Sequence, residues 1–417
     1  GTPAGAWPPP PPPPAVPSYA QGAGAGSTWG ASYAAQHPEG PKPAGRRGGL
    51  IAAVLVAALV AGGIGGGIGF WAAERNDDAT DSTTVSASDT PADLKREPGS
   101  VAGIAHKALP SVVTIEAQGG NGEGGTGTGF VYDTQGHILT NNHVVASAAD
   151  GGKLAATFSN GKKYDAEVVG RAEGYDVAVI KLKNRPADLK PLRLGNSDRV
   201  AVGDSTIAIG APFGLSNTVT TGIVSAKDRP VTSSDGASSK SSYMSALQTD
   251  ASINPGNSGG PLLDSRGAVI GINSAIKPAE SGGGLGGSGQ SGSIGLGFAI
   301  PVNQAKYVAE QLIKNGQAVY PVIGASVSLG EDTGGATISQ EGASGSQAVT
   351  PNGPADKAGL KPGDVITTLD DTVIDSGPTL IGQIWTHKPG DKVKITFERD
   401  GKERTVDVVL GQRKGES

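Results

Sequence analysis

From Val101 onward, short apolar runs alternate with turns rich in Gly, Asn and Asp. The runs are three to eight residues long and are enriched in β-branched residues, as half-buried strands are. We expect strands at 111–117, 129–133, 137–140, 153–158, 164–171, 177–182, 204–210, 218–225, 261–263, 268–274 and 295–299. Strands this short and this closely spaced predict an antiparallel β barrel or sandwich rather than βαβ units.

A different pattern begins at residue 304. Residues 304–314 place their apolar side chains on one helical face and end at Asn315-Gly316, which predicts an amphipathic helix. A second, smaller α+β domain is expected at 320–412. Its predicted elements are a short helix at 354–358, a strand at 365–369, a helix at 380–385 and a hairpin of 392–399 with 402–410 across Asp400-Gly401.

The chain before Val101 does not have a globular pattern. Residues 50–73 carry no charge and are long enough for a helix that spans a bilayer. Arg46 and Arg47 precede this run and acidic residues follow it, so the N-terminus is expected in the cytoplasm and the rest outside. A cleaved signal peptide is the alternative to an uncleaved anchor. We expect 1–49, with its proline run, to be a disordered tail, and 74–100 to be an acidic linker.

Composition narrows the chemistry. The chain has no cysteine, which excludes disulfides, thiol nucleophiles and cysteine-based zinc sites. The net charge is −5 and no long basic tract is present, so nucleic acid is not an expected partner. We expect no metal and no cofactor. A nucleotide site at the glycine run 124–129 is disfavoured, because no P-loop lysine or helix follows it.

One loop has the pattern of a catalytic nucleophile. Residues 254–261 read Asn-Pro-Gly-Asn-Ser-Gly-Gly-Pro. Glycines at this spacing let the chain turn so that the amides of Gly256, Asn257 and Ser258 could converge on one point, an oxyanion hole. They also leave space beside the Ser258 hydroxyl. A structural Gly/Pro turn is the alternative, since glycine is abundant in this chain.

A serine nucleophile needs a base, and this chain has five histidines. His143 ends a predicted buried strand, whereas the others lie in the tail, in turns or in the second domain (His37, His106, His137 and His387). Asp176 directly precedes the apolar run 177–182, where a buried carboxylate must be paired. The acids Asp165, Asp198 and Asp204 remain alternatives with weaker apolar flanks. The order His143, Asp176, Ser258 is that of double β-barrel serine proteases.

Several stretches resemble the HtrA/Deg family (high-temperature-requirement A) of serine proteases. They are Gly127–Val145, Asp176–Ile180, Leu194–Leu215, Thr218–Ser225, Leu247–Pro261 and Gly295–Val302. The resemblance implies a chymotrypsin-like, trypsin-like protease domain at 101–316 and a PDZ domain at 320–412. It implies that His143 is the general base, Asp176 its orienting acid and Ser258 the nucleophile.

The same resemblance implies several finer features. The amides of Gly256 and Ser258 would form the oxyanion hole. Val322, Ile323, Gly324 and Ala325 would form the PDZ loop that receives a peptide C-terminus. Simple homotrimers are favoured over large cages, because the segment Gly119–Gly125 is short.

Substrate preference depends on the residue six before the nucleophile, Ser252, which is not an acid. A preference for basic side chains is therefore disfavoured. Ile253 and Ile276 are candidates to line a pocket for a small or medium apolar side chain. The sequence predicts a membrane-anchored serine endopeptidase outside the cytoplasm that degrades misfolded envelope proteins. A PDZ chaperone or scaffold with a mostly latent protease domain is the alternative.

Overall fold

The computed structural model describes residue 60, residues 97–211 except 121, 123 and 150, and residues 218–234, 241–275 and 295–415 except 331–333, 343 and 344. The predicted tail at 1–49 and, apart from single positions at 60 and 97–100, the predicted anchor and linker lie outside these residues. Within the described part of the chain, no helix is long and apolar enough to cross a bilayer.

Six strands form a first closed barrel in the order β1-β2-β3-β6-β5-β4. Its strands are β1 (Val112–Gln118), β2 (Gly124–Val131), β3 (His137–Thr140), β4 (Lys153–Phe158), β5 (Lys163–Ala172) and β6 (Val177–Leu182). All neighbouring strands are antiparallel. Apolar side chains such as Ile115, Ile138 and Ile180, each 0% exposed, fill the interior. Along β4 the positions alternate between the barrel interior and its surface, whereas β3 is buried at every position.

A second closed barrel follows in the order β10-β11-β12-β9-β8-β7. Its strands are β7 (Ser205–Gly210), β8 (Thr218–Ser234), β9 (Ser241–Thr249), β10 (Pro261–Asp264), β11 (Val269–Ser274) and β12 (Gly297–Pro301). The expected all-β fold is confirmed as two barrels, so the sandwich alternative does not apply.

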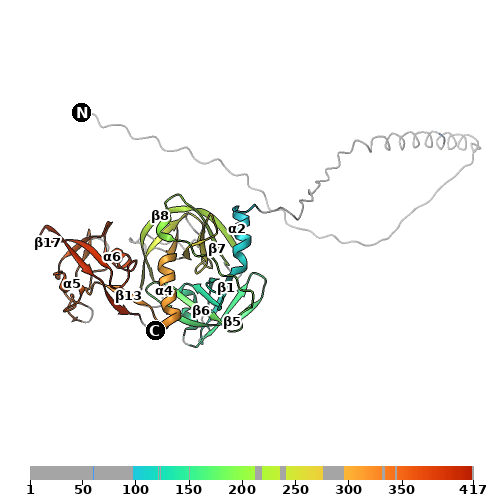
Figure 1. The fold of residues 1–417 in the computed structure, drawn as a ribbon, viewed down its shortest axis with the longest axis horizontal. Helices are drawn as coiled ribbons and strands as arrows, with labels where there is room; N and C mark the ends of the chain where they lie inside the picture. Colours follow the sequence, from blue (N-terminus) through green and yellow to red (C-terminus); the bar gives the residue numbers. More distant parts are fainter. Residues whose placement is uncertain are drawn as a thin grey trace, which may run out of the picture. The chain divides into compact units, whose positions relative to one another are not determined.

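Short helices join and cover the barrels. They are α2 (Val101–Ala108), the 3-10 turns Leu109–Ser111, Ala146–Ala148 and Ser197–Arg199, the one-turn helix α3 (Asn142–Val145), and α4 (Val302–Asn315). In Figure 1, α4 runs beside both barrels, and its buried residues include Val308 and Leu312. The helix ends where Gly316 takes the left-handed conformation at φ 72°, which glycine adopts without strain.

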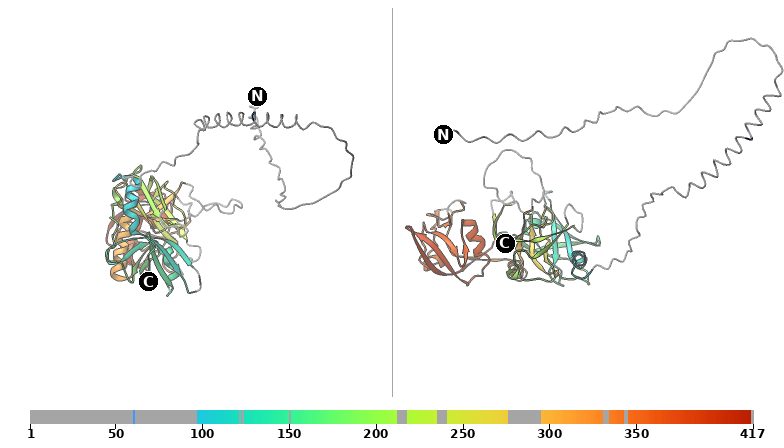
Figure 2. Two further views of the ribbon diagram at one scale, coloured as in Figure 1. Left: turned by 90° about the vertical axis from the view of Figure 1, so that its right-hand side faces the viewer. Right: turned by 90° about the horizontal axis from the view of Figure 1, so that it is seen from above.

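The last elements form a separate small fold. A two-stranded sheet pairs β13 (Val319–Val322) with β19 (Gly411–Lys414), and a second sheet contains β14 (Ala336–Thr337), β15 (Val365–Leu369), β16 (Thr372–Val373), β17 (Lys392–Arg399) and β18 (Lys402–Val409). The helices are α5 (Pro354–Lys357) and α6 (Gly377–Ile384). The right view of Figure 2 shows these C-terminal elements, drawn in orange to red, as a fold of their own.

The structure adds elements that the sequence pattern missed. Helix α2 and strand β9 were not expected, β2 begins five residues earlier than the predicted strand at 129, and β8 extends to Ser234. The start of β2 is rich in glycine, which has a low intrinsic strand propensity. Glycine is needed there for packing, because a Cβ at Gly127 would lie 2.6 Å from Val144 Cγ2.

Candidate active site

The structure pairs the predicted base with the predicted acid. His143 lies in α3, just after β3, rather than at the end of the strand itself. Its Nδ1 is 2.9 Å from Asp176 Oδ2 and 3.0 Å from Oδ1, and its backbone N–H also donates to Oδ1 at 3.1 Å. When a carboxylate holds the Nδ1–H, Nε2 is the ring nitrogen that carries the lone pair and accepts a proton.

Asp176 is buried, whereas the rival acids are not. Its residue is 3% exposed, while Asp165, Asp198 and Asp204 are exposed. A third donor, the Ser274 hydroxyl, lies 3.2 Å from Oδ2. The Asn141 side chain donates to the Asp176 carbonyl at 2.9 Å. A buried carboxylate with these donors is compensated for the loss of water.

The end of β11 links the acid to the predicted nucleophile. Ser274 donates to Asp176, and the backbone N–H of the next residue, Ala275, donates to Ser258 Oγ at 3.0 Å. Two consecutive residues therefore hold the carboxylate and the hydroxyl. On the other side, a Cβ on Gly127 of β2 would lie 2.6 Å from Val144 Cγ2 and 3.1 Å from the Ser258 carbonyl oxygen. The helix that bears His143 and the loop that bears Ser258 thus flank the same point of β2.

Hydrogen bonds fix three consecutive peptide groups of the nucleophile loop. The Gly256 carbonyl accepts from Thr128 Oγ1 at 2.6 Å, and the Asn257 amide donates to the Asn254 carbonyl at 2.9 Å. The Asn257 carbonyl accepts from the Gly260 amide at 3.0 Å. The Ser258 carbonyl accepts from the Thr128 amide at 2.8 Å, and the Gly259 amide donates to the Asn273 carbonyl at 2.9 Å.

This arrangement leaves two amides of the loop for another acceptor. Among the described residues, neither the Gly256 nor the Ser258 N–H donates a hydrogen bond. The Asn257 N–H, expected from sequence to join them, is instead bonded to Asn254. Gly256 takes a φ of 101°, which requires glycine. An oxyanion hole requires amide donors beside the serine that have no acceptor within the protein, and within the described part of the chain these two amides meet that requirement.

The candidate specificity residues differ in their surroundings. Ser252 is exposed, and its carbonyl accepts from the Asn257 side chain at 3.2 Å. Ile253 is 6% exposed and belongs to the apolar cluster of the second barrel. Ile276 lies outside the described residues.

The candidate PDZ loop follows β13. The carbonyls of Ile323 and Gly324 accept from the amides of Ala355 and Thr350, both at 2.8 Å. In the part of the chain that the structure describes, the amides of Gly324 and Ala325 donate to no other group. Gly324 has a φ of 74°, so it too occupies a glycine conformation.

Other histidines have different partners. His137 is 4% exposed, and its Nδ1 lies 2.6 Å from Asp133 Oδ2 in the turn between β2 and β3. His106 is exposed on α2, and His387 Nε2 lies 3.6 Å from Asp370 after α6. Among the described residues, no group of three acidic or histidine side chains is arranged to hold a metal ion.

Sequence reasoning missed Ser274 and Thr128. Both touch the site only through tertiary contacts, since Ser274 is 98 residues from Asp176 and Thr128 is 128 residues from Gly256. Each is a small hydroxyl residue in a buried strand, and that position is the one local signal that could have drawn attention to them.

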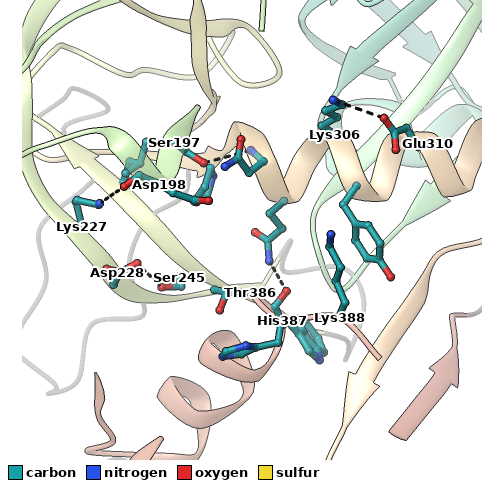
Figure 3. A pocket seen from close by; sticks show the side chains of 16 residues that line it. Ser197, Asp198, Lys227, Asp228, Ser245, Lys306, Glu310, Thr386, His387 and Lys388 are labelled. Atoms are coloured by element: carbon teal, nitrogen blue, oxygen red, sulfur yellow. Dashed lines mark hydrogen bonds and ion pairs between the residues drawn. The ribbon is translucent and has the colours of Figure 1, made fainter. Parts of the chain in front are cut away.

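A cavity of about 620 Å³ lies elsewhere, between α4, the β8–β9 ribbon and the segment after α6 (Figure 3). On its wall Lys306 pairs with Glu310, and Lys227 Nζ donates to the backbone carbonyl of Asp198. None of His143, Asp176 and Ser258 lines it.

Comparison with known proteins agrees with this architecture. Residues 127–272 match the model of the trypsin-like peptidase domain, and residues 321–410 match that of the PDZ domain. The chain is 41% identical over 324 residues to serine protease PepD of Mycobacterium tuberculosis, covering 76% of this chain and 67% of that protein. It is 40% identical over 305 residues to the periplasmic serine endoprotease DegP of Escherichia coli, covering 71% of this chain and 60% of that protein.

Solved structures give the same result. A structure described as the HtrA-type protease AlgW with tripeptide superposes with a TM-score of 0.55 and 34% sequence identity, covering 75% of this chain and 97% of the other. The chain spans about 60% to 67% of the length of the two curated relatives named above.

Proposed function

The chain belongs to the HtrA/Deg family of serine endopeptidases, and we propose that His143, Asp176 and Ser258 are its catalytic triad. In this mechanism Asp176 holds the Nδ1–H of His143, so that Nε2 accepts the proton of Ser258. The alkoxide oxygen attacks the peptide carbonyl, and the Gly256 and Ser258 amides stabilise the oxyanion. His143 then protonates the leaving amine, and the acyl-enzyme remains. In the second half, His143 takes a proton from water, the water oxygen attacks the ester carbonyl, and His143 returns the proton to the Ser258 oxygen as it leaves.

The observation that carries this proposal is the pair of bonds at the end of β11. Ser274 holds the Asp176 carboxylate, and Ala275 donates to the Ser258 hydroxyl oxygen. The end of β11 thus holds both the carboxylate that bonds to His143 and the hydroxyl oxygen of Ser258, which supports these three residues as the reacting groups. The protein or peptide nature of the substrate follows from family membership.

Two substitutions test the triad. Ser258→Ala should abolish casein hydrolysis and labelling by a fluorophosphonate, while the folded structure persists. Asp176→Asn should lower kcat by about 10⁴-fold, because the amide favours the wrong imidazole tautomer. Asp133→Asn is the matched control, since Asp133 pairs with His137 in the same barrel but outside the site. Full activity of Ser258→Ala would place the nucleophile elsewhere.

We also propose that the loop Val322–Ala325 binds peptide C-termini by strand addition. The unbonded amides of Gly324 and Ala325 support this, because a carboxylate needs such donors. A fluorescent peptide with a free C-terminus should bind, and the same peptide with a C-terminal amide should bind at least about 10-fold more weakly. Equal affinity for the two peptides would argue against the proposal.

The domain organisation is proposed as 101–316 for the protease and 320–412 for the PDZ domain, preceded by the tail, the anchor at 50–73 and the linker. The charge-free run with Arg46 and Arg47 before it supports an anchor with its C-terminal side outside the cytoplasm. The periplasmic location named for DegP fits this orientation. Protease added to spheroplasts, in which the outer face of the cytoplasmic membrane is accessible, should then digest the catalytic domain, and protection of that domain would reverse the assignment.

Substrates are proposed to be misfolded or envelope proteins, cleaved by a homotrimer or a multiple of it after small or medium apolar residues. Ser252 at the pocket position supports the last point, because it is not acidic. Cleavage of a peptide library mainly after Arg or Lys would refute the proposed apolar preference. Mass measurement after crosslinking would give the number of subunits in the oligomer.

The alternative function is that of a chaperone or scaffold with a latent protease domain. It predicts a protein that does not react with a fluorophosphonate but still suppresses aggregation of unfolded proteins.

A further inference from the structure

We infer that Thr128 is a positioning residue for the oxyanion hole, an inference that rests on the proposed function. Thr128 lies in β2 of the first barrel and is 0% exposed. Its amide and hydroxyl both donate to the nucleophile loop, which belongs to the second barrel. Thr128, a residue of the first barrel, thus hydrogen-bonds through its side chain and its backbone to the nucleophile loop of the second barrel.

The Thr128 hydroxyl bonds to Gly256, a residue of the loop whose backbone has the conformational freedom of glycine. It donates to the Gly256 carbonyl at 2.6 Å and accepts from the Ala211 amide at 2.9 Å, so both of its roles are used. Gly256 has no Cβ to restrict its backbone. Its carbonyl has no other donor among the described residues. Without the Thr128 hydroxyl, rotation about Gly256 could turn the Gly256 N–H away from the substrate carbonyl.

The backbone of Thr128 fixes the other half of the hole. Its N–H donates to the Ser258 carbonyl at 2.8 Å, and its own carbonyl accepts from Thr140 Oγ1 at 2.7 Å. There is also no room for the loop to shift, because a Cβ at Gly259 would lie 2.1 Å from the Thr128 carbonyl oxygen. Thr128 therefore holds the carbonyls of Gly256 and Ser258, the two residues whose amides are proposed to bind the oxyanion.

The test compares side chains at position 128 in the full chain. Thr128→Ser and Thr128→Ala remove the same methyl group, but only serine keeps the hydroxyl. We expect Thr128→Ser to retain kcat within about twofold, and Thr128→Ala to lower kcat about 10-fold to 100-fold with little change in KM for a short peptide. A peptide aldehyde inhibitor, whose adduct carries an oxyanion, should lose affinity in Thr128→Ala by a similar factor.

Thr206 supplies the control. It is 1% exposed in β7, and its hydroxyl bonds to Thr249 Oγ1 at 2.8 Å, away from the nucleophile loop. Thr206→Ala should destabilise the fold as Thr128→Ala does but leave kcat unchanged. Equal loss of kcat in the two alanine variants, or failure of serine to rescue, would reduce Thr128 to a structural role and overturn the inference.

A readout independent of activity separates this inference from the proposed function. Amide hydrogen exchange in the fragment that contains residues 254–260, followed by mass spectrometry, should accelerate in Thr128→Ala and not in Thr206→Ala. If the wild-type chain has no serine reactivity, the proposed function fails, but faster exchange would still show that Thr128 positions the loop. Unchanged exchange in Thr128→Ala would overturn the inference whatever the activity.

Discussion

Asp176 adopts the left-handed backbone conformation at φ 52°, which is uncommon for a residue with a Cβ. Such a conformation costs about 1–3 kcal/mol and persists only when the surroundings impose it. Here the Asp176 amide donates to the Glu173 carbonyl at 3.0 Å, and the carboxylate accepts from His143 and Ser274. At the scale of single residues, the site is therefore built on strained positions that the fold holds in place.

Gly259 is the residue with the least freedom beside the nucleophile. It has a φ of 83°, and a Cβ there would lie 2.1 Å from the Thr128 carbonyl oxygen and 2.2 Å from Thr140 Oγ1. We predict that Gly259→Ala abolishes peptidase activity and lowers the free energy of unfolding by more than the roughly 1–2 kcal/mol of backbone strain alone. Gly203→Ala is the control in denaturant unfolding, since Gly203 has a φ of 95° but no atom within 4 Å of the added Cβ.

The pairing of Asp133 with His137 makes a pH prediction. Burial alone would raise the pKa of Asp133, but hydrogen bonds from the His137 side chain and from the His137 and Gln135 amides outweigh it and lower the pKa below 3.8. A group with a lowered pKa stabilises the fold fully above its unfolded value and loses this effect as the pH falls through the folded value. Unfolding midpoints between pH 5 and pH 2 should therefore decline less steeply in Asp133→Asn, and identical slopes would contradict the prediction.

At the scale of elements, the long β8–β9 ribbon extends beyond a regular barrel strand. Its register shifts between Val224 and Ala226 and again between Ala226 and Arg229, and Asp228 has a φ of 54°. Bulges of this kind bend a strand and increase its twist. Past the bulge the ribbon reaches α6, where a Cβ on Gly382 would lie 3.3 Å from the Met244 backbone. Because of the bulge, the β8–β9 hairpin pairs within the second barrel and also contacts α6 of the small C-terminal fold.

The turn before β15 depends on one buried ion pair. Asp364 is 1% exposed and accepts from Arg399 Nε at 2.5 Å and from Arg399 Nη2 at 2.6 Å, while the Lys361 amide donates to it at 2.7 Å. We predict that Asp364→Ala destabilises the PDZ domain by about 1–3 kcal/mol, because the partly exposed Arg399 and the Lys361 amide lose their acceptor. Asp407→Ala should leave the unfolding midpoint nearly unchanged, since the Asp407 pair with Lys392 is exposed. Trp385 fluorescence can follow the transition, and similar effects of the two substitutions would refute the prediction.

At the scale of the whole described molecule, an aromatic cluster connects the small C-terminal fold to the turn that carries Asp176. The ring of Tyr175 stacks on that of Tyr320 in β13, with 4.5 Å between the ring centroids. Its centroid lies 5.3 Å from that of Trp385, which follows α6. The Gly174 amide donates to the Tyr320 oxygen at 3.1 Å, and burial raises the pKa of Tyr320 to about 12, so the phenol stays neutral. The turn that carries Asp176, the proposed catalytic acid, is thus packed by residues from outside the barrels.

This contact predicts a catalytic effect of a PDZ residue. Trp385→Ala should lower kcat for a short peptide about 10-fold, because Tyr175 loses packing and the Asp176 turn loosens. Trp385→Phe should retain most of the rate, and Val373→Ala, at a side chain 74% exposed on the same fold, should have no effect. The measurement is steady-state kinetics with a peptide too short to reach the PDZ domain. Wild-type kcat in Trp385→Ala would show that the cluster only joins the two folds.

Local sequence patterns predict the strands in which apolar residues cluster and whose ends carry turn residues. The predicted strands at 137–140, 153–158 and 177–182 have the observed bounds, and the Gly/Ser loop at 254–261 and the flanks of Asp176 drew attention to the candidate site. These signals are local, because periodicity and turn chemistry act between residues close in the chain.

Only the tertiary structure decided how these pieces are held together. Thr128 meets Gly256, Ser274 meets Asp176 and Trp385 meets Tyr175 across sequence separations that leave no periodic pattern. The direction of the Asn257 amide, bonded to Asn254 instead of pointing to an oxyanion, likewise depends on the folded loop. Hydrogen-bond geometry and side-chain packing are set by the three-dimensional neighbours of a residue, so the chain alone could name the reacting groups but not the contacts that position them.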